Sequence, residues 1–140
     1  MDLRLACVTL TVHDLGAALA FYRDVLGFEV REDVRFGDAR WVAVGPPAQP
    51  GVRIALAPPG LGRATAADRR AVEGLLADGL LSGPAFRTDD CDAAFEHVEA
   101  AGVEVVQEPV DRPSGVRDCA FFDPSGTILR FAGTSKTGST

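Results

Sequence analysis

The sequence predicts an α+β fold in which two βαβββ modules follow one another along the chain. The stretch "VTLTVHDLGAALAFYRDVLGFEV" has the order strand, tight turn, helix, glycine and strand, and "PAFRTDDCDAAFEHVEAAGVEVV" repeats that order. Asp14 and Asp90 are 76 residues apart, and Gly27 and Gly102 are 75 residues apart. A nearly constant offset of this kind indicates two copies of one structural unit.

The first module is predicted to span residues 5–57. It begins with a β-branched, apolar run at 5–12, which is typical of a strand. Asp14 then stands at the N-cap of a helix over 15–25, whose apolar residues recur at helical spacing, and Gly27 ends that helix. The turn-rich stretches "FGDA" and "GPPAQPG" separate the three strands that follow. These strands are expected at 28–35, 40–45 and 52–57.

The second module, predicted over residues 84–132, has the same plan. A strand at 84–88 leads to Asp89 and Asp90, which are both cap candidates for a helix over 91–101. Gly102 ends this helix, and the turn "DPSG" precedes the last strand. The three strands after the helix are expected at 103–108, 116–122 and 127–132.

A connector over 58–83 joins the modules. Thr65 is a cap candidate for a short helix over 66–77, which Asp78 and Gly79 would close. Such a helix packs over a sheet edge or, alternatively, covers a pocket as a lid. The small polar residues of 133–140 predict a flexible tail.

Two such units can place their sheets side by side as a curved, mixed-sheet half-barrel, with the helices on the convex side. The concave side is then a cleft lined by every second strand residue. Trp41, on the predicted third strand, is the aromatic residue that we expect to face a ligand rather than the core. Strand alternation predicts that the following residues face the cleft: Cys7, Thr9, Thr11, Arg53, Ala55, Ala57, Gly83, Ala85, Arg87, Ile128 and Arg130.

The composition excludes several partners. The 140-residue chain has a formal net charge of −6, which disfavours binding to nucleic acid. It contains no apolar run long enough to span a bilayer, and its first residues do not have the pattern of a signal peptide. The three cysteines have no CxxC spacing, which argues against a disulfide framework and a structural zinc site. We therefore expect a cytoplasmic protein.

The strand–"DL"–helix–"FY…LGF" phrase and "FFDPSGTILRF" resemble the vicinal oxygen chelate superfamily. This group includes glyoxalase I, extradiol dioxygenases, fosfomycin-resistance enzymes and bleomycin-resistance proteins. The resemblance implies a single domain over residues 1–140. Metal-dependent members place four ligands, usually His and Glu, on their strands. Those positions correspond here to Cys7, Ala55, Gly83 and Arg130.

The four residues predict that the usual metal site is absent, because alanine and glycine have no donor atom and arginine is a cation. We therefore expect no metal ion and no other cofactor. His13, in the strand–helix turn, and His97, on the second helix, match none of the ligand positions. Cys7 has no obvious base beside it and is expected to be a small strand thiol rather than a nucleophile.

The resemblance then favours a metal-independent, non-catalytic homodimer that binds a small organic molecule, as in antibiotic sequestration of the bleomycin-resistance type. A glyoxalase- or dioxygenase-like enzyme with a non-standard site is the alternative, and a dimerising module without a ligand is a third. Arg130 either grips an anionic ligand group or pairs internally with an acid such as Asp118. The predicted ligand-binding residues are Cys7, Thr9, Trp41, Arg53, Ala55, Gly83, Ala85, Arg87 and Arg130.

Overall fold

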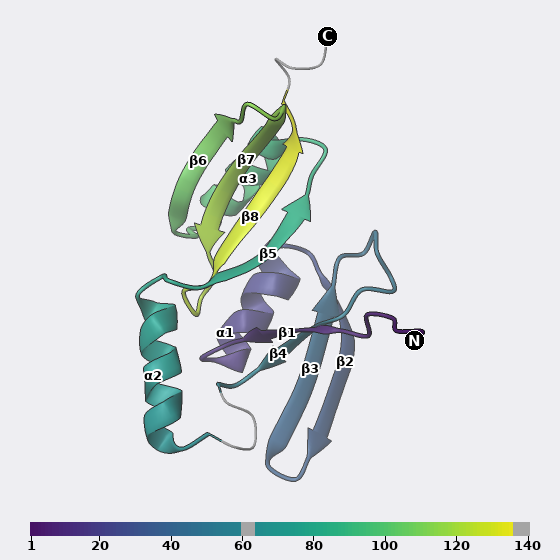
Figure 1. Cartoon of the computed structure of the whole chain (residues 1–140), viewed down its shortest axis with the longest axis vertical. Helices are drawn as coiled ribbons and strands as arrows, with labels where there is room; N and C mark the ends of the chain where they lie inside the picture. Colours follow the sequence, from purple (N-terminus) through teal and green to yellow (C-terminus); the bar gives the residue numbers. More distant parts are fainter. Residues whose placement is uncertain (60–63, 136–140) are drawn as a thin grey trace. The chain divides into compact units, whose positions relative to one another are not determined.

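The computed structural model describes residues 1–59 and 64–135. The chain forms two compact units, Met1–Glu73 and Gly74–Thr140. Each unit contains a four-stranded mixed sheet, and helical residues cover one face of that sheet (Figure 1). The predicted α+β class with two βαβββ modules is thus confirmed. Within the described residues, no helix is both long and apolar enough to cross a membrane.

The first unit has the strand order β1-β4-β3-β2, in which β1 and β4 run parallel and the other neighbours antiparallel. Its sheet places Val42, Val44 and Leu56 against the helical residues, where all three are almost fully buried. The elements of this unit before the connector are β1 (Val8–Thr11), α1 (Leu15–Leu19), η1 (Ala20–Val25), β2 (Glu29–Phe36), β3 (Ala39–Gly45) and β4 (Ile54–Ala57).

The first helix begins and ends as the sequence predicts, but its second half is a π-helix. Asp14 is the N-cap, and its Oδ1 accepts a hydrogen bond of 3.1 Å from the backbone N–H of Ala17. The backbone N–H of Leu26 donates to the carbonyl of Phe21, five residues earlier, at 3.0 Å. Gly27 then adopts a positive φ of 75°, which a glycine reaches without steric cost.

The connector helix α2 (Ala66–Ala77) matches the predicted range. A reciprocal capping arrangement begins it: the Thr65 N–H donates to Asp68 Oδ2 at 3.0 Å, and the Asp68 N–H donates to Thr65 Oγ1 at 3.1 Å. This arrangement provides acceptors for two backbone N–H groups at the helix start, those of Thr65 and Asp68. The same bonds to Thr65 lower the pKa of Asp68.

The second unit repeats the topology with the strand order β5-β8-β7-β6, in which β5 and β8 are parallel. The α3 helix packs on its sheet through Phe95, which stacks on Phe121 with ring centroids 5.3 Å apart. Asp90 is the N-cap of α3 and accepts a hydrogen bond from the Ala93 N–H at 3.0 Å. The elements of this unit after the connector are β5 (Ser82–Arg87), α3 (Cys91–Ala100), β6 (Val105–Asp111), β7 (Val116–Phe122) and β8 (Ile128–Thr134).

The C-terminal boundary differs from the prediction. The last strand continues to Thr134, so residues 133–134 belong to β8 rather than to a flexible tail. The backbone N–H of Ser135, which is buried, donates to the carbonyl of Gly115 at 2.8 Å and holds the end of the strand in place. Residues 136–140 of the predicted tail lie outside the described residues.

Candidate functional site

Each sheet has one buried face and one open face, and the strand register shows which residues share the open face. In the first unit, Thr9 pairs with Ala55 and Thr11 pairs with Ala57. The residue between the two threonines, Leu10, is buried toward the helical side. Because strand side chains alternate between faces, the threonines and alanines lie on the face opposite Leu10, where Thr9 is exposed but Ala55 and Ala57 are themselves buried.

The tryptophan also lies on the open face of the first sheet. Its neighbour Val42 is fully buried on the helical side, so Trp41 points the other way and is partly exposed. It lies opposite Val34 of β2, which is 41% exposed. This orientation is the one that the sequence predicts, whereas contact with a ligand stays a prediction.

Two further predicted residues of this unit precede their strands. Cys7 comes just before β1 and is partly exposed. Arg53 comes just before β4, and its Nη1 donates to Glu32 Oε1 in an ion pair. Arg53 is therefore a paired cation in this structure, and a ligand would compete with Glu32 for it.

The open face of the second sheet carries two arginines, on the strands β5 and β8 that correspond to β1 and β4 of the first sheet. Ala85 pairs with Arg130, and Arg87 pairs with Ala132. The side chain of Arg130 is 45% exposed. Arg87 is exposed too, and no hydrogen bond or ion pair joins its side chain to another residue in the described part of the chain.

Arg130 borders a polar network that sequence reasoning only partly foresaw. Its Nη1 lies 3.4 Å from Gln107 Oε1 and 4.0 Å from Asp118 Oδ1. Arg112 is the stronger partner of Asp118, because its Nε donates to both carboxylate oxygens at 3.2 Å. Gln107 Nε2 adds a hydrogen bond of 2.8 Å to Asp118 Oδ1.

The network keeps Asp118 ionised. Its side chain is 14% exposed, and burial alone would raise its pKa, but the hydrogen bonds from Arg112 and Gln107 leave the pKa below its ordinary value. Each interpretation of Arg130, ligand binding or internal pairing, is supported in part. Its guanidinium lies 4.0 Å from Asp118, at the limit of an ion pair, while Arg112 neutralises that carboxylate. Arg112 and Gln107 gave no signal in the sequence, because a bulged strand and a turn bring them there.

Gly83 does not follow the predicted alternation. A register shift between Ser82 and Ala85 inserts an extra residue into β5 relative to β8. A Cβ atom at Gly83 would lie 2.5 Å from Thr127 Cγ2 and 3.3 Å from Leu129 Cδ2, both of which are buried. This position therefore faces the buried side rather than the face of Arg130, and no larger side chain fits there. The predicted open-face orientation of Gly83 is wrong.

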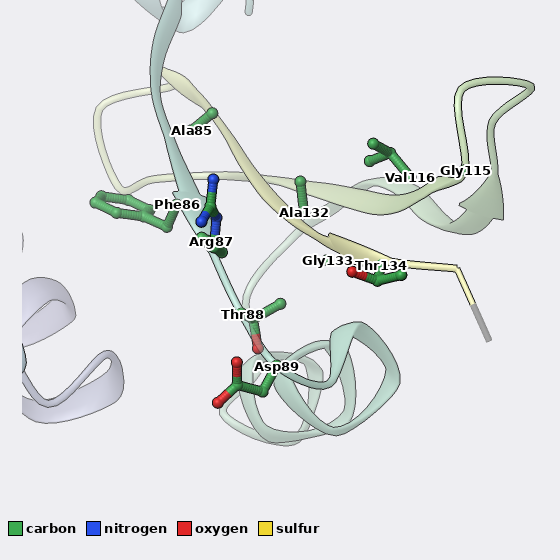
Figure 2. Close-up of a pocket in the computed structure, with 10 residues that line it drawn as sticks. All are labelled: Ala85, Phe86, Arg87, Thr88, Asp89, Gly115, Val116, Ala132, Gly133 and Thr134. Carbon is green, nitrogen blue, oxygen red and sulfur yellow. The ribbon is translucent and has the colours of Figure 1, made fainter. Parts of the chain in front are cut away.

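A pocket of about 630 Å³ opens at the ends of β5 and β8. Figure 2 shows Arg87 on β5 and Ala132 on β8 at its wall, with Asp89 just beyond β5. Its size is in the range of small-molecule sites. The lining residues are Ala85, Phe86, Arg87, Thr88, Asp89, Gly115, Val116, Ala132, Gly133 and Thr134.

Comparison with known proteins identifies the family. The sequence profile of the Glyoxalase/Bleomycin resistance protein/Dioxygenase superfamily matches residues 4–131. The chain belongs to this superfamily. Among curated proteins it is similar to an uncharacterised protein of Bacillus subtilis, YurT, with 26% identity over 129 residues, which are 91% of this chain and 97% of that one.

Solved structures of the superfamily include similar chains. UcmS2 is 36% identical with a TM-score of 0.88, covering 94% of this chain and 98% of its own. TnmS3, described as an antibiotic binding protein from Streptomyces sp. CB03234, is 25% identical with a TM-score of 0.74, covering 96% and 98%. A superfamily member from Sphaerobacter thermophilus is 27% identical with a TM-score of 0.75, covering 94% and 98%.

Three of the four positions that the resemblance assigns to metal ligands carry side chains that cannot coordinate a metal ion, and Cys7 is the fourth. Ala55 has no donor atom, Gly83 has no room for one, and Arg130 carries a positive charge. Within residues 1–59 and 64–135, no group of three or more His, Cys, Asp or Glu side chains is placed to hold a metal ion. His13 instead lies 3.4 Å from Glu73 of α2, and His97 is exposed on α3.

Proposed function

We propose that this superfamily member binds a small organic molecule on the open face of its sheets, as an antibiotic-binding protein does, without using the superfamily's metal. The observation that carries the proposal is Arg130, a partly exposed arginine at a position where the resemblance places a metal ligand. An arginine there attracts an anionic or electron-rich group rather than a metal cation.

The second unit supports the proposal most directly. Its open face combines the predicted residues Ala85, Arg87 and Arg130, and two of these line the 630 Å³ pocket. The likeness to TnmS3 adds support, because that protein is described as antibiotic-binding. In the first unit, we propose that Trp41 and Thr9 contact the ligand, with the buried Ala55 beside Thr9. Cys7 and Arg53 remain predicted contacts.

The experiment is a thermal-shift screen of the purified protein against a panel of antibiotics and acidic metabolites, followed by titration of Trp41 fluorescence with the hits. We expect at least one compound to raise the midpoint and saturate with one ligand per chain. Arg130→Gln should weaken the binding of that compound, whereas Arg70→Gln, which changes an exposed residue of α2, is the matched control and should leave binding unchanged.

Metal analysis of the same preparation tests the enzyme alternative. Stoichiometric Ni, Zn, Mn or Fe coupled to turnover of a glyoxalase- or dioxygenase-type substrate would overturn the proposal. A panel with no hits would favour a dimerising module without a ligand. The homodimer remains a separate prediction, which mass measurement by light scattering checks.

A further inference from the structure

The two units place the same strand pairs at the same register, which makes their open faces comparable residue by residue. Thr9 opposite Ala55 in the first unit corresponds to Ala85 opposite Arg130 in the second. One step farther along the strands, Thr11 opposite Ala57 corresponds to Arg87 opposite Ala132. The four uncharged positions of the first unit thus hold two arginines in the second.

These two arginines are close neighbours. Arg87 and Arg130 lie on adjacent parallel strands, displaced by two residues, and strand spacing places their Cα atoms roughly 8 Å apart. Long arginine side chains starting at that separation can converge on one group of atoms. Between them, Ala85 and Ala132 form a floor without bulky side chains.

Two arginines make this face locally positive, although the whole chain carries a net charge of −6 and Asp89 adds one carboxylate at the pocket wall. The side chain of Arg87 has no partner within the described residues, and that of Arg130 reaches only the neutral Gln107 Oε1 at 3.4 Å and Asp118 at 4.0 Å. Arg112 already neutralises Asp118 through two hydrogen bonds of 3.2 Å. The positive charges of Arg87 and Arg130 are therefore left for a ligand.

We propose that this face selects its ligand by charge: it takes a small molecule with a carboxylate or phosphate group, which Arg87 and Arg130 hold beside the alanine floor. The inference rests on the proposed function, since it specifies the ligand class of the same site. Paired guanidinium groups bind planar carboxylates and phosphates through several charge-assisted hydrogen bonds. Phe86 is not part of this face, because it alternates with Ala85 and Arg87 on β5 and its ring stacks on the buried Phe131 at 5.9 Å.

Calorimetric titrations with three probes of equal aromatic body test the proposal: 2-naphthoate, 2-naphthyl phosphate and the neutral 2-naphthamide. The acids should bind at least about tenfold more tightly than the amide, the effect of one charged hydrogen bond. NMR shifts of the amide signals of Ala85 and Ala132 on addition of 2-naphthoate should show the place of binding. The phosphate arm distinguishes which acidic group the two arginines prefer.

Variants decide between the inference and the broader function. Arg87→Gln and Arg130→Gln should each lower the affinity for 2-naphthoate about tenfold and leave the affinity for 2-naphthamide unchanged. Arg70→Gln is the control, and circular dichroism checks that each variant folds. Equal binding of acid and amide would overturn the inference while keeping the proposed function. Failure of both acids to bind at millimolar concentration, or unchanged affinity in the double variant, would also overturn it. If a compound of the antibiotic panel that has no acidic group then binds, the proposed function holds and only the inference about the ligand class is overturned.

Discussion

The two βαβββ units share a backbone plan but differ in the chemistry of their open faces. Trp41 of β3 and Asp118 of β7 are equivalent positions. Trp41 precedes Val42, which pairs with Leu56, and Asp118 precedes Cys119, which pairs with Phe131, the equivalent of Leu56. Glu32 likewise corresponds to Gln107. The first face thus has an aromatic side chain and the Arg53–Glu32 ion pair. The second face is polar, and its Arg87 and Arg130 have no close ion pair within the described residues. The duplication preserves the buried faces and leaves the open faces free to diverge.

The largest contrast that we expect concerns the thiols. Cys119 corresponds to Val42, and both are fully buried, so this thiol replaces a core side chain. Burial raises the pKa of Cys119 to about 12 and also raises the pKa of Cys91. These thiols can react only after the unit opens, so an opening free energy of about 5 kcal/mol slows them roughly a thousandfold or more.

Mass spectrometry after timed alkylation with iodoacetamide at pH 8 measures this contrast. We expect one rapid modification, at the partly exposed Cys7, and two slow ones. The Cys7→Ser variant is the control, in which the rapid phase should disappear. Rapid modification of Cys91 or Cys119 in the folded protein would contradict the comparison of the buried faces.

The buried faces should also respond alike to truncation. Phe131→Ala should lower the free energy of unfolding by about 3–5 kcal/mol, and Leu56→Ala by about 2–5 kcal/mol, because both remove side chains that are almost completely buried. Urea denaturation followed by circular dichroism measures both changes. The exposed change Val34→Ala is the control, and a loss below about 1 kcal/mol at either core position would show that the two faces are not equivalent.

The sequence could predict these buried faces because hydrophobic periodicity and glycine positions are local signals. Asp14, Asp90, Gly27 and Gly102 fixed both helices to within a residue or two. The open faces were harder to predict, since they depend on register. The shift between Ser82 and Ala85 turned Gly83 away, and no local pattern announces such a bulge. Nor could spacing show that Arg112, from a turn, would reach Asp118.

The helix caps test whether the units tolerate the same loss. Asp14→Ala and Asp90→Ala each remove one acceptor for a backbone N–H, at 3.1 and 3.0 Å, and each should cost about 1 kcal/mol of unfolding free energy. Asparagine at either position retains the acceptor and should restore most of the stability. A cost at Asp90 well above that at Asp14 would indicate that the π-helix following α1 makes the first helix less dependent on its cap.

The smallest effect that we expect is the pH dependence that Asp118 contributes on the second unit's open face. The folded pKa of Asp118 lies below its unfolded value, because hydrogen bonds from Arg112 and Gln107 outweigh the effect of burial. Its contribution to stability is therefore complete above the unfolded pKa of about 3.9 and is lost as the pH falls through the lower folded pKa. Tryptophan, at the equivalent position of the first unit, does not titrate.

Denaturation at a series of pH values from 6 to 2 measures this contribution. Asp118→Asn should make the acid loss of stability shallower below about pH 4. Asp33→Asn gives the comparison on the first unit, where hydrogen bonds from Arg40 also lower a carboxyl pKa. Equal acid profiles for wild type and Asp118→Asn would mean that the carboxylate adds no pH-dependent stability. In that case, the pairing of Arg112 with Asp118 would not contribute to folding stability. The argument that Arg112 neutralises Asp118, and so leaves the charge of Arg130 for a ligand, would then have no support.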